Sequence, residues 1–510
     1  MYILNTFGLN LGIVLALQGP WGAWLFPGGD MVGSVTLGMI LCIFNGLAYG
    51  LMAAAMPRSG GDYVWVSHVI NPLLGFMISW AFVLNVSFAI GMYAGMTSSY
   101  GVSATFVILG TLLNNSGMTE FGSTAATPNG IYAIGTFAIW ISVVIFIFGA
   151  KAIKWFLIGM FIPSILGIVA ALVVFLGTSH ETFVSQFNTL MASYTNSPDS
   201  YNLILDTARE AGATLPAMSL AATVTSLPLG YWAYVGFANS AWVGGEVKTP
   251  SRSQPLAILG ALLIAWAIYA SMLWKYYDVV GWDFNNAIAY LYFAAPDKYV
   301  LPAPPTMNFF VGIVTPNPYV NGLIGASFIL WIFMLAIPLL TSRCMFSWAF
   351  NRVMPEALAR VDKRGSPWVS LIVSGILGQI FLTLFAYTTL LNLVNYTIIW
   401  AIMFFIGGLS AITLPYKRKD LFDASPGIVK KRIAGAPVLV ISGIMNAVLF
   451  GFIIIFSIIN PAFSGPSGPS AYTLVATIFV SGIVVYLVSK AIRKRQGIDL
   501  ELVWKEVPPE

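Results

Sequence analysis

Long apolar stretches alternate with short polar ones along the whole chain. A helix that crosses the hydrocarbon core of a membrane needs about 20 mostly apolar residues, because its backbone polar groups find no water there. Charge-free runs of this length recur, and Gly, Pro and polar residues divide the longest of them in two. We therefore predict twelve membrane-spanning helices, at residues 4–26, 31–56, 72–100, 129–149, 152–177, 218–245, 255–280, 320–348, 368–387, 391–414, 437–460 and 471–490. Residues 101–113 are also apolar and extend the third helix or lie at the surface.

The composition agrees with an all-α integral membrane protein and excludes several other classes. Only 8% of the 510 residues are charged and 58% are hydrophobic, whereas about a quarter of a soluble domain is charged. A soluble enzyme, a nucleic-acid binder and a disordered chain are excluded on this ground. Cys42 and Cys344 lie in or beside apolar stretches, which is typical of packed core residues. His68 and His180 are predicted to lie in polar loops, so a haem-carrying subunit is not expected, and no cofactor is predicted.

Lysine and arginine are distributed very unevenly between the two sides of the predicted bundle. With both termini placed in the cytoplasm, nearly all of the 24 Lys and Arg residues lie on the cytoplasmic side. The exceptions are Arg209, Lys275 and Lys298. Because cytoplasmic loops are enriched in Lys and Arg, this predicts a multi-pass plasma membrane protein with both termini inside. The longer polar loops, 177–217 and 281–318, are then external.

Two predicted spans contain residues that weaken a helix. Gly8, Asn10 and Gly12 follow one another closely in the first span, and Gly236 lies among aromatic residues in the sixth. Interrupted helices at corresponding places in two halves are the best sequence indication of a transporter site. Unwound backbone offers N–H groups to a carboxylate and C=O groups to an ammonium or a cation. The alternative is that these glycines serve only helix packing.

The predicted spans hold no Asp, Glu, Lys or Arg at depth. Charges inside a membrane usually mark proton relays, ion paths or sites for charged ligands. Their absence argues against a proton antiporter subunit and favours a neutral or zwitterionic solute.

Three segments resemble signatures of the amino acid–polyamine–organocation (APC) superfamily. Residues 56–66 read MPRSGGDYVWV, which is similar to the pattern P-x-(S/A)-G-G-x-Y-x-(Y/W). Residues 245–255 read GEVKTPSRSQP and resemble E-x-K-x-P-x-R-x-x-P. Residues 342–355 resemble S-R-x-x-x-x-x-x-R-D-G-x-x-P, although Asn351 and Arg352 stand in the usual R-D-G core. All three lie on the predicted cytoplasmic side, as the family requires.

The resemblance implies the APC fold, a five-plus-five inverted repeat in which helices 1 and 6 are discontinuous. One transport domain would cover residues 1–490, followed by a cytoplasmic tail at 491–510. Within the domain, residues 1–177 form the first repeat and 218–414 the second, and 437–490 hold two extra C-terminal helices. The implied function is transport of amino acids or related amines by alternating access. Oligomeric state is not indicated.

The family's substrate site is carried onto this chain residue by residue. The unwound segments of helices 1 and 6 hold the substrate's amino and carboxyl groups in the family, and an aromatic residue on helix 6 covers it. The implied substrate-binding residues are Gly8, Asn10, Gly12, Trp232, Tyr234, Val235, Gly236 and Phe237. The alternative for Trp232 and Tyr234 is simple packing. The chain has only seven residues before Gly8, so either the break lies later, near Gly19 and Pro20, or the recorded start is short.

Coupling to an ion is implied but not assigned. Some proton-coupled relatives carry a Glu where Ala238 stands and others a Lys where Ser164 stands, so both groups are missing here. Thr341 and Ser342 are candidate ligands for Na⁺, and backbone-bonded hydroxyls are the alternative. H⁺ symport, uniport and exchange also remain open. Candidate cytoplasmic gate residues, which would titrate or form ion pairs, are Arg58, Asp62, Glu246, Lys248 and Arg343.

Two other classes are weighed against a permease. An integral membrane enzyme would need clustered acids, His or Arg at an interface, and the acids of the external loops show no metal or nucleophile spacing. A channel would lack the pair of interrupted helices. The sequence therefore predicts no catalytic residue and no metal site.

Overall fold

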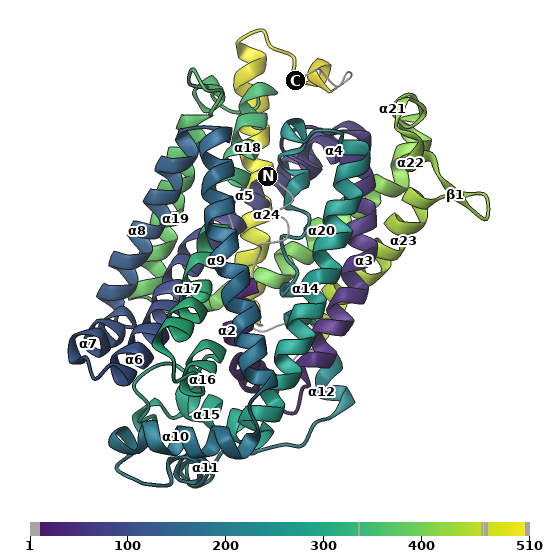
Figure 1. The fold of residues 1–510 in the computed structure, drawn as a ribbon. Coiled ribbons are helices and arrows are strands. Elements are labelled where there is room, and N and C mark those ends of the chain that lie inside the picture. Colours follow the sequence, from purple (N-terminus) through teal and green to yellow (C-terminus); the bar gives the residue numbers. More distant parts are fainter. Residues whose placement is uncertain (1–10, 335–336, 461–462, 464–467, 505–510) are drawn as a thin grey trace.

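The computed structural model describes residues 11–334, 337–460, 463 and 468–504, and most of them are helical. Within this part of the chain, nine helices are long and apolar enough to cross a membrane (Figure 1). Many of their large apolar side chains are exposed, among them Val173 of α9 and Ile459 of α23. A soluble protein rarely exposes so much apolar surface. The protein is therefore a multi-pass membrane protein, whereas the exact count of twelve helices stays a prediction.

The first half of the chain follows the predicted spans closely. Its elements are α2 (Leu11–Leu25), α3 (Met31–Ala55), α4 (Asp62–Val69), α5 (Pro72–Met96), the π-helix η1 (Thr97–Val102), α6 (Ser103–Leu112), α7 (Ser116–Ala125), α8 (Pro128–Ile147) and α9 (Ala150–Leu176). The third span is longer than 72–100, because α5, η1 and α6 form one apolar helix to Leu112. Asp30 and Asn71 cap α3 and α5 by accepting bonds from backbone N–H groups of the first turn.

The sixth span is interrupted, as predicted. It begins with α12 (Leu220–Thr225) and α13 (Leu227–Trp232), and regular α-helix resumes only at α14 (Pro250–Val280). Between them lie two single 3₁₀ turns, η2 (Asn239–Ala241) and η3 (Gly244–Glu246). The predicted break in the first span, at Gly8 and Asn10, lies outside the described residues. The alternative break near Gly19 and Pro20 is wrong, because α2 continues through both residues.

The remaining elements include helices in segments that the sequence presented as polar loops. These are α10 (His180–Thr195), α11 (Ser200–Glu210), α15 (Trp282–Ala294), η4 (Pro296–Lys298) and α16 (Met307–Ile313). The eighth span consists of α17 (Pro318–Met334) and α18 (Ile337–Phe350). It is followed by η5 (Glu356–Ala359), α19 (Trp368–Tyr387), η6 (Leu390–Leu393), α20 (Tyr396–Lys417), α21 (Lys419–Ala424), α22 (Gly427–Lys430), β1 (Arg432–Ile433), β2 (Ala436–Pro437), α23 (Val438–Ile459), α24 (Pro469–Arg495) and α25 (Leu500–Val503). β1 and β2 form a small antiparallel hairpin.

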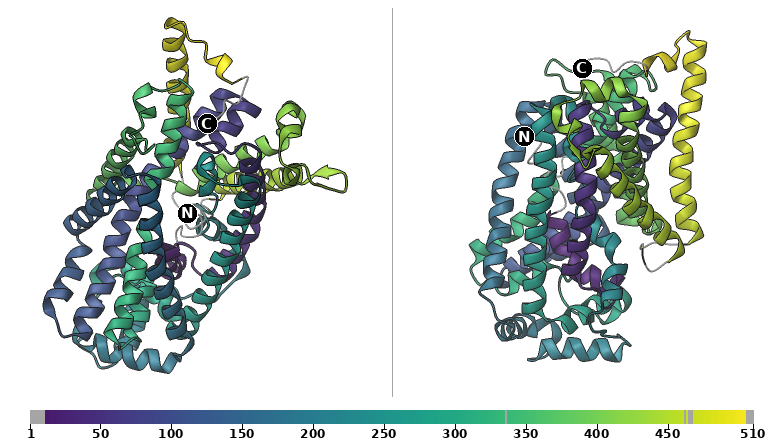
Figure 2. Two further views of the ribbon diagram at one scale, coloured as in Figure 1. Left: turned by 45° about the horizontal axis from the view of Figure 1, so that its top comes forward. Right: turned by 90° about the vertical axis from the view of Figure 1, so that its right-hand side faces the viewer.

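The helices are arranged around the interrupted sixth span. α3 packs along both α13 and α14, α5 packs against α19, and α24 lies along the outer edge against α5 (Figure 2). Gly38 of α3 lies very close to Gly230 of α13, since a Cβ on Gly38 would lie 2.3 Å from the Gly230 carbonyl carbon. Helices α10 and α11 lie at the opposite end of the bundle from α4 (Figure 1). Cys42 and Cys344 are buried, as predicted.

Candidate functional site

The backbone leaves its helical path in the middle of the bundle. We call residues 232–238 the core segment. After α13 ends at Trp232, the segment continues through short turns, with Phe237 N–H donating to the Tyr234 carbonyl at 3.0 Å and Asn239 N–H to the Gly236 carbonyl at 2.9 Å. Gly236 has φ +105°, a region that side chains other than glycine rarely enter. The glycine therefore permits the interruption that the sequence predicted.

Neighbouring helices satisfy part of the freed backbone. The hydroxyl of Tyr269 on α14 donates to the Ala233 carbonyl at 3.1 Å. The hydroxyl of Tyr234 donates to the Val35 carbonyl of α3 at 2.9 Å. The amide N–H of Gly236, in contrast, has no hydrogen-bond partner among the described residues. Buried N–H groups are nearly always paired. Since this one has no partner among the described residues, it is available to an acceptor such as a bound ligand.

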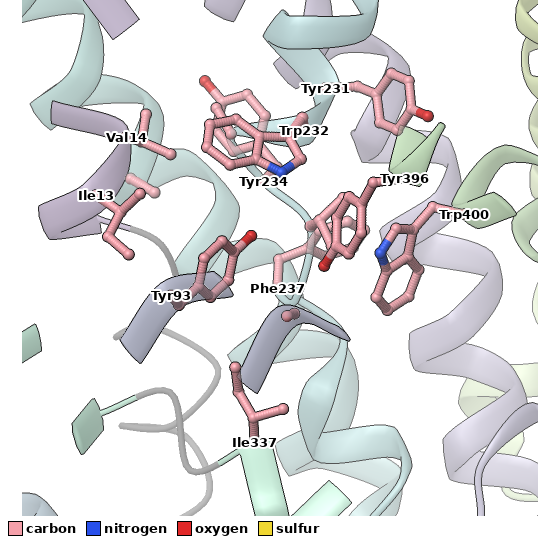
Figure 3. Close-up of a cluster of buried hydrophobic side chains, with 14 of the residues drawn as sticks. Ile13, Val14, Tyr93, Tyr231, Trp232, Tyr234, Phe237, Ile337, Tyr396 and Trp400 are labelled. Atoms are coloured by element: carbon pink, nitrogen blue, oxygen red, sulfur yellow. The ribbon is translucent and has the colours of Figure 1, made fainter. Parts of the chain in front are cut away.

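Aromatic and aliphatic side chains surround the core segment (Figure 3). The Trp232 ring meets Tyr93 of α5 edge-on, with centroids 6.4 Å apart, and Phe237 lies 6.4 Å from Phe404 of α20. Ile13 of α2 and Ile337 of α18 point toward the same cluster (Figure 3). Trp232 is 5% exposed and Phe237 is 3% exposed, so the site is closed to solvent.

The predicted residues of the first span are only partly placed. Gly8 and Asn10 lie outside the described residues, whereas Gly12 is in the first turns of α2. A Cβ on Gly12 would lie 2.7 Å from Cβ of Trp331 of α17, so this glycine serves close packing. Gly12 also borders a small cavity shared with Thr97 and Tyr100 of η1.

The π-helix η1 was missed by sequence reasoning. Its signal is the hydroxyl run at 97–99, since Thr97 Oγ1 donates to the Tyr93 carbonyl at 2.9 Å and Ser99 Oγ to the Gly95 carbonyl at 3.1 Å. Such back-bonding loosens helical geometry, and π-helices often occur at functional sites.

The three family signatures meet at the end of the bundle that holds α4. We call this the motif layer, comprising residues 57–63, 242–247 and 342–351. Gly60 N–H donates to the Trp242 carbonyl at 2.9 Å, and Ser347 Oγ donates to the Ser59 carbonyl at 2.5 Å. Asn351 of the third signature donates through Nδ2 to the Tyr63 hydroxyl at 3.2 Å. Segments far apart in the sequence are thus joined across one end of the site.

One of the candidate gate ion pairs is present in this layer. Arg343 Nε lies 2.7 Å from Glu246 Oε1, and the Arg343 side chain is only 8% exposed. Arg343 is therefore a largely buried member of its ion pair. Arg58 and Lys248 form no ion pair with any residue that the structure describes.

Asp62, one of the candidate gate residues, forms no ion pair with any residue that the structure describes. Its side chain is fully buried and has no cationic partner among the described residues. Oδ1 accepts from Trp242 Nε1 and Oδ2 from the Tyr49 hydroxyl, both at 3.2 Å. Burial raises the pKa of Asp62 to about 7, against the opposing effect of these hydrogen bonds. The same helix holds His68, which is buried with Nδ1 2.8 Å from the Val64 carbonyl, so its predicted place in a polar loop is wrong.

The two candidate ligands for Na⁺ lie inside α18. Thr341 Oγ1 donates to Ser374 Oγ of α19 at 2.8 Å, and Ser342 Oγ donates to the Leu339 carbonyl at 2.8 Å. Both hydroxyl protons are thus engaged locally, and their role in ion binding stays a prediction.

A buried, non-helical segment inside a spanning helix, ringed by aromatic side chains, is typical of proteins that carry small solutes across membranes. The molecule is thus a membrane transport protein by its architecture, and its relatives are transporters rather than enzymes. The chain belongs to the amino acid permease family, whose family model matches residues 6–484.

Several curated proteins are similar to the chain. The branched-chain amino acid permease BcaP of Lactococcus lactis is 23% identical over 411 residues, which cover 78% of each chain. The glutamate/serine transporter AimA of Bacillus subtilis is 22% identical over 82% of this chain and 72% of its own length. The branched-chain amino acid permease BcaP of Bacillus subtilis is 23% identical over 83% of this chain and 84% of its own length.

Proposed function

We propose that this permease is a secondary active transporter that moves amino acids across the plasma membrane by alternating access. Both termini then lie in the cytoplasm, and the motif layer forms the cytoplasmic gate. Family membership supports amino acids as the solute. The uneven distribution of Lys and Arg supports the orientation.

The proposal rests mainly on the Gly236 N–H in the closed core segment, which has no hydrogen-bond partner in the part of the chain that the structure describes. A substrate carboxylate would accept from this donor, because backbone N–H groups at a helix interruption bind anions well. Val235, Gly236 and Phe237 would provide this half of the site. Gly8 and Asn10 would provide the other half in the inverted repeat that we propose, while Gly12 packs against Trp331.

The side chains around the core segment favour a neutral amino acid with an apolar side chain. Among the buried hydrophobic side chains drawn in Figure 3, Ile13 and Ile337 lie near Trp232, Tyr234 and Phe237 of the core segment. Such a lining would leave a charged substrate side chain buried without a partner, which is costly. Two of the related proteins are named branched-chain amino acid permeases, which agrees with this class.

Trp232 would cover the bound substrate, since it begins the core segment and faces Tyr93 across the cluster. Coupling would be to H⁺ or Na⁺. An uncoupled uniporter and an amino acid exchanger of the same fold are the alternatives. Thr341 and Ser342 are the candidate Na⁺ ligands.

Uptake into proteoliposomes tests the proposal. The purified protein should concentrate radiolabelled leucine, isoleucine or valine when H⁺ or Na⁺ gradients are imposed one at a time. Accumulation against a gradient distinguishes a coupled carrier from a channel or a uniporter, and recovery of unchanged solute distinguishes it from an enzyme. Exchange without accumulation would indicate an exchanger. Failure of every amino acid in a full panel to bind, exchange or accumulate would overturn the proposal.

A further inference from the structure

Asp62 is a fully buried carboxyl group at the start of α4, outside the candidate spans. Its two carboxyl oxygens accept hydrogen bonds from two different parts of the fold. Tyr49, which donates to Oδ2, is on α3, whereas Trp242, which donates to Oδ1, lies in the same non-helical stretch as Gly236. Asp62 therefore links a packed helix to the stretch that contains the proposed substrate site.

The described groups that face Asp62 leave its charge uncompensated. The titratable neighbours are the phenol of Tyr49 on α3 and the thiol of Cys344 on α18. The helix α4 itself also carries Tyr63 and His68. α5, which packs against α4, contains no Asp, Glu, Lys, Arg or His. α20 also packs against α4, and its Lys417 is exposed in the last turn.

Two guanidinium groups of this region are engaged elsewhere, and Arg58, four residues before Asp62, forms no ion pair with any residue that the structure describes. Arg343 pairs with Glu246 at 2.7 Å, and Arg418 pairs with Asp420 at 2.8 Å. A carboxylate buried without a cation loses its hydration with little in return, so the neutral acid is favoured. Burial accordingly raises the pKa of Asp62 to about 7, while the Tyr49 and Trp242 donors act in the opposite direction.

We propose that Asp62 is a proton-binding site, and that loss of its proton destabilises the closed motif layer by placing an unpaired charge beside Trp242. This inference rests on the proposed transport function and names H⁺ as its coupling ion. The step is a simple proton exchange between the carboxyl group and water. The carboxyl oxygens keep their bonds from Tyr49 and Trp242 only while the layer is closed.

The Trp242 ring transmits this change to the rest of the layer. The ring stacks on Phe82 of α5 with centroids 4.6 Å apart. The backbone carbonyl of Trp242 accepts from Gly60 N–H at 2.9 Å. If water enters to hydrate a charged Asp62, Trp242 must move and both contacts are disturbed. Opening at this end would then expose the core segment to the cytoplasm.

An infrared titration tests proton binding directly and needs no substrate. In lipid-reconstituted wild-type protein, we expect a carboxylic acid C=O band that disappears as the pH rises through about 7. The band should be absent from Asp62→Asn and present in Glu246→Gln, the matched control in the same layer. A titrating band that persists in Asp62→Asn, or its absence from wild type, would overturn the proposal.

A second variant tests the proposal independently if Asp62→Asn does not fold. Tyr49→Phe removes one donor that favours the charged form, so the midpoint of the band should move to higher pH. An unchanged midpoint would count against the assignment of the band to Asp62.

Transport then tests the coupling. In Asp62→Asn, the accumulation driven by a pH gradient should fall at least tenfold. The variant should still exchange internal for external amino acid. Accumulation equal to that of wild type would overturn the coupling role. If wild-type protein neither binds nor exchanges any amino acid, the proposed function fails, and the infrared titration still decides whether Asp62 binds a proton.

Discussion

The core segment and the motif layer are held together in different ways. In the core segment, side chains meet mainly through aromatic contacts such as Trp232 with Tyr93, and the Gly236 N–H has no partner among the described residues. In the motif layer, specific polar bonds join distant segments, and the Arg343–Glu246 pair is one of them.

This difference separates two tasks. Free backbone between apolar rings suits binding of a small zwitterion, because the binding groups are already positioned and the walls exclude water. Interlocked polar bonds suit a gate, because a few discrete contacts can form in one conformation and break in the other. Substitutions in the two regions should therefore affect affinity and gating separately.

The largest expected effect comes from the core segment. Gly236→Leu places a branched side chain at φ +105° and covers the free N–H. The backbone strain costs about 1–3 kcal/mol, and substrate binding should be lost, as measured by ligand-induced thermal stabilisation and uptake. Gly260→Leu is the matched control, since a Cβ at Gly260 meets no atom within 4 Å. Normal uptake by Gly236→Leu would remove the site assignment.

A smaller loss is expected when the proposed cover is removed. Trp232→Ala should weaken apparent affinity about tenfold, because burial of one aromatic ring against the substrate contributes about 1–3 kcal/mol. Concentration-dependent uptake measures this change. Trp274→Ala, which alters a 59% exposed ring on α14, is the control and should transport normally. Wild-type affinity in Trp232→Ala would indicate that Trp232 only packs.

In the motif layer, Glu246→Gln should change rates rather than binding. It leaves the mostly buried Arg343 guanidinium without its carboxylate, which costs about 1–3 kcal/mol in the closed state. We expect uptake to fall severalfold with substrate affinity nearly unchanged. The exchanged pair Glu246→Arg with Arg343→Glu should recover part of the rate. A loss of affinity without loss of rate would contradict the separation of tasks.

The last expected effect is on the pH dependence of stability rather than on transport. The folded pKa of Asp62 is raised to about 7, so the folded state holds the proton more tightly than the unfolded chain. Stability from this group is therefore greatest below the unfolded pKa and falls as the pH rises from about 4 to about 7. The melting temperature should decrease over this range in wild type and decrease less in Asp62→Asn. A steeper decrease in the variant would contradict this sign.

The C-terminal segment shows a contact that no local pattern predicts. α24 continues to Arg495, and Trp504 packs edge-on against Tyr63 and His68 of α4, with centroids 5.7 and 5.3 Å apart. Residues near the two ends of the sequence thus meet beside the motif layer. Sequence patterns report the local environment of a residue and give no information about such distant neighbours.

The sequence alone predicted the nine long apolar helices of the described residues and the interruption of the sixth span. Long apolar runs must become helices in a bilayer, and Gly236 among bulky residues is a local signal of an interruption. Only the tertiary structure decided that Asp62 is buried with no cationic partner among the described residues, that Arg343 pairs with Glu246, and that Tyr269 satisfies the Ala233 carbonyl. The physical reason is that burial and pairing depend on which helices become neighbours, and residues far apart in the sequence determine that arrangement.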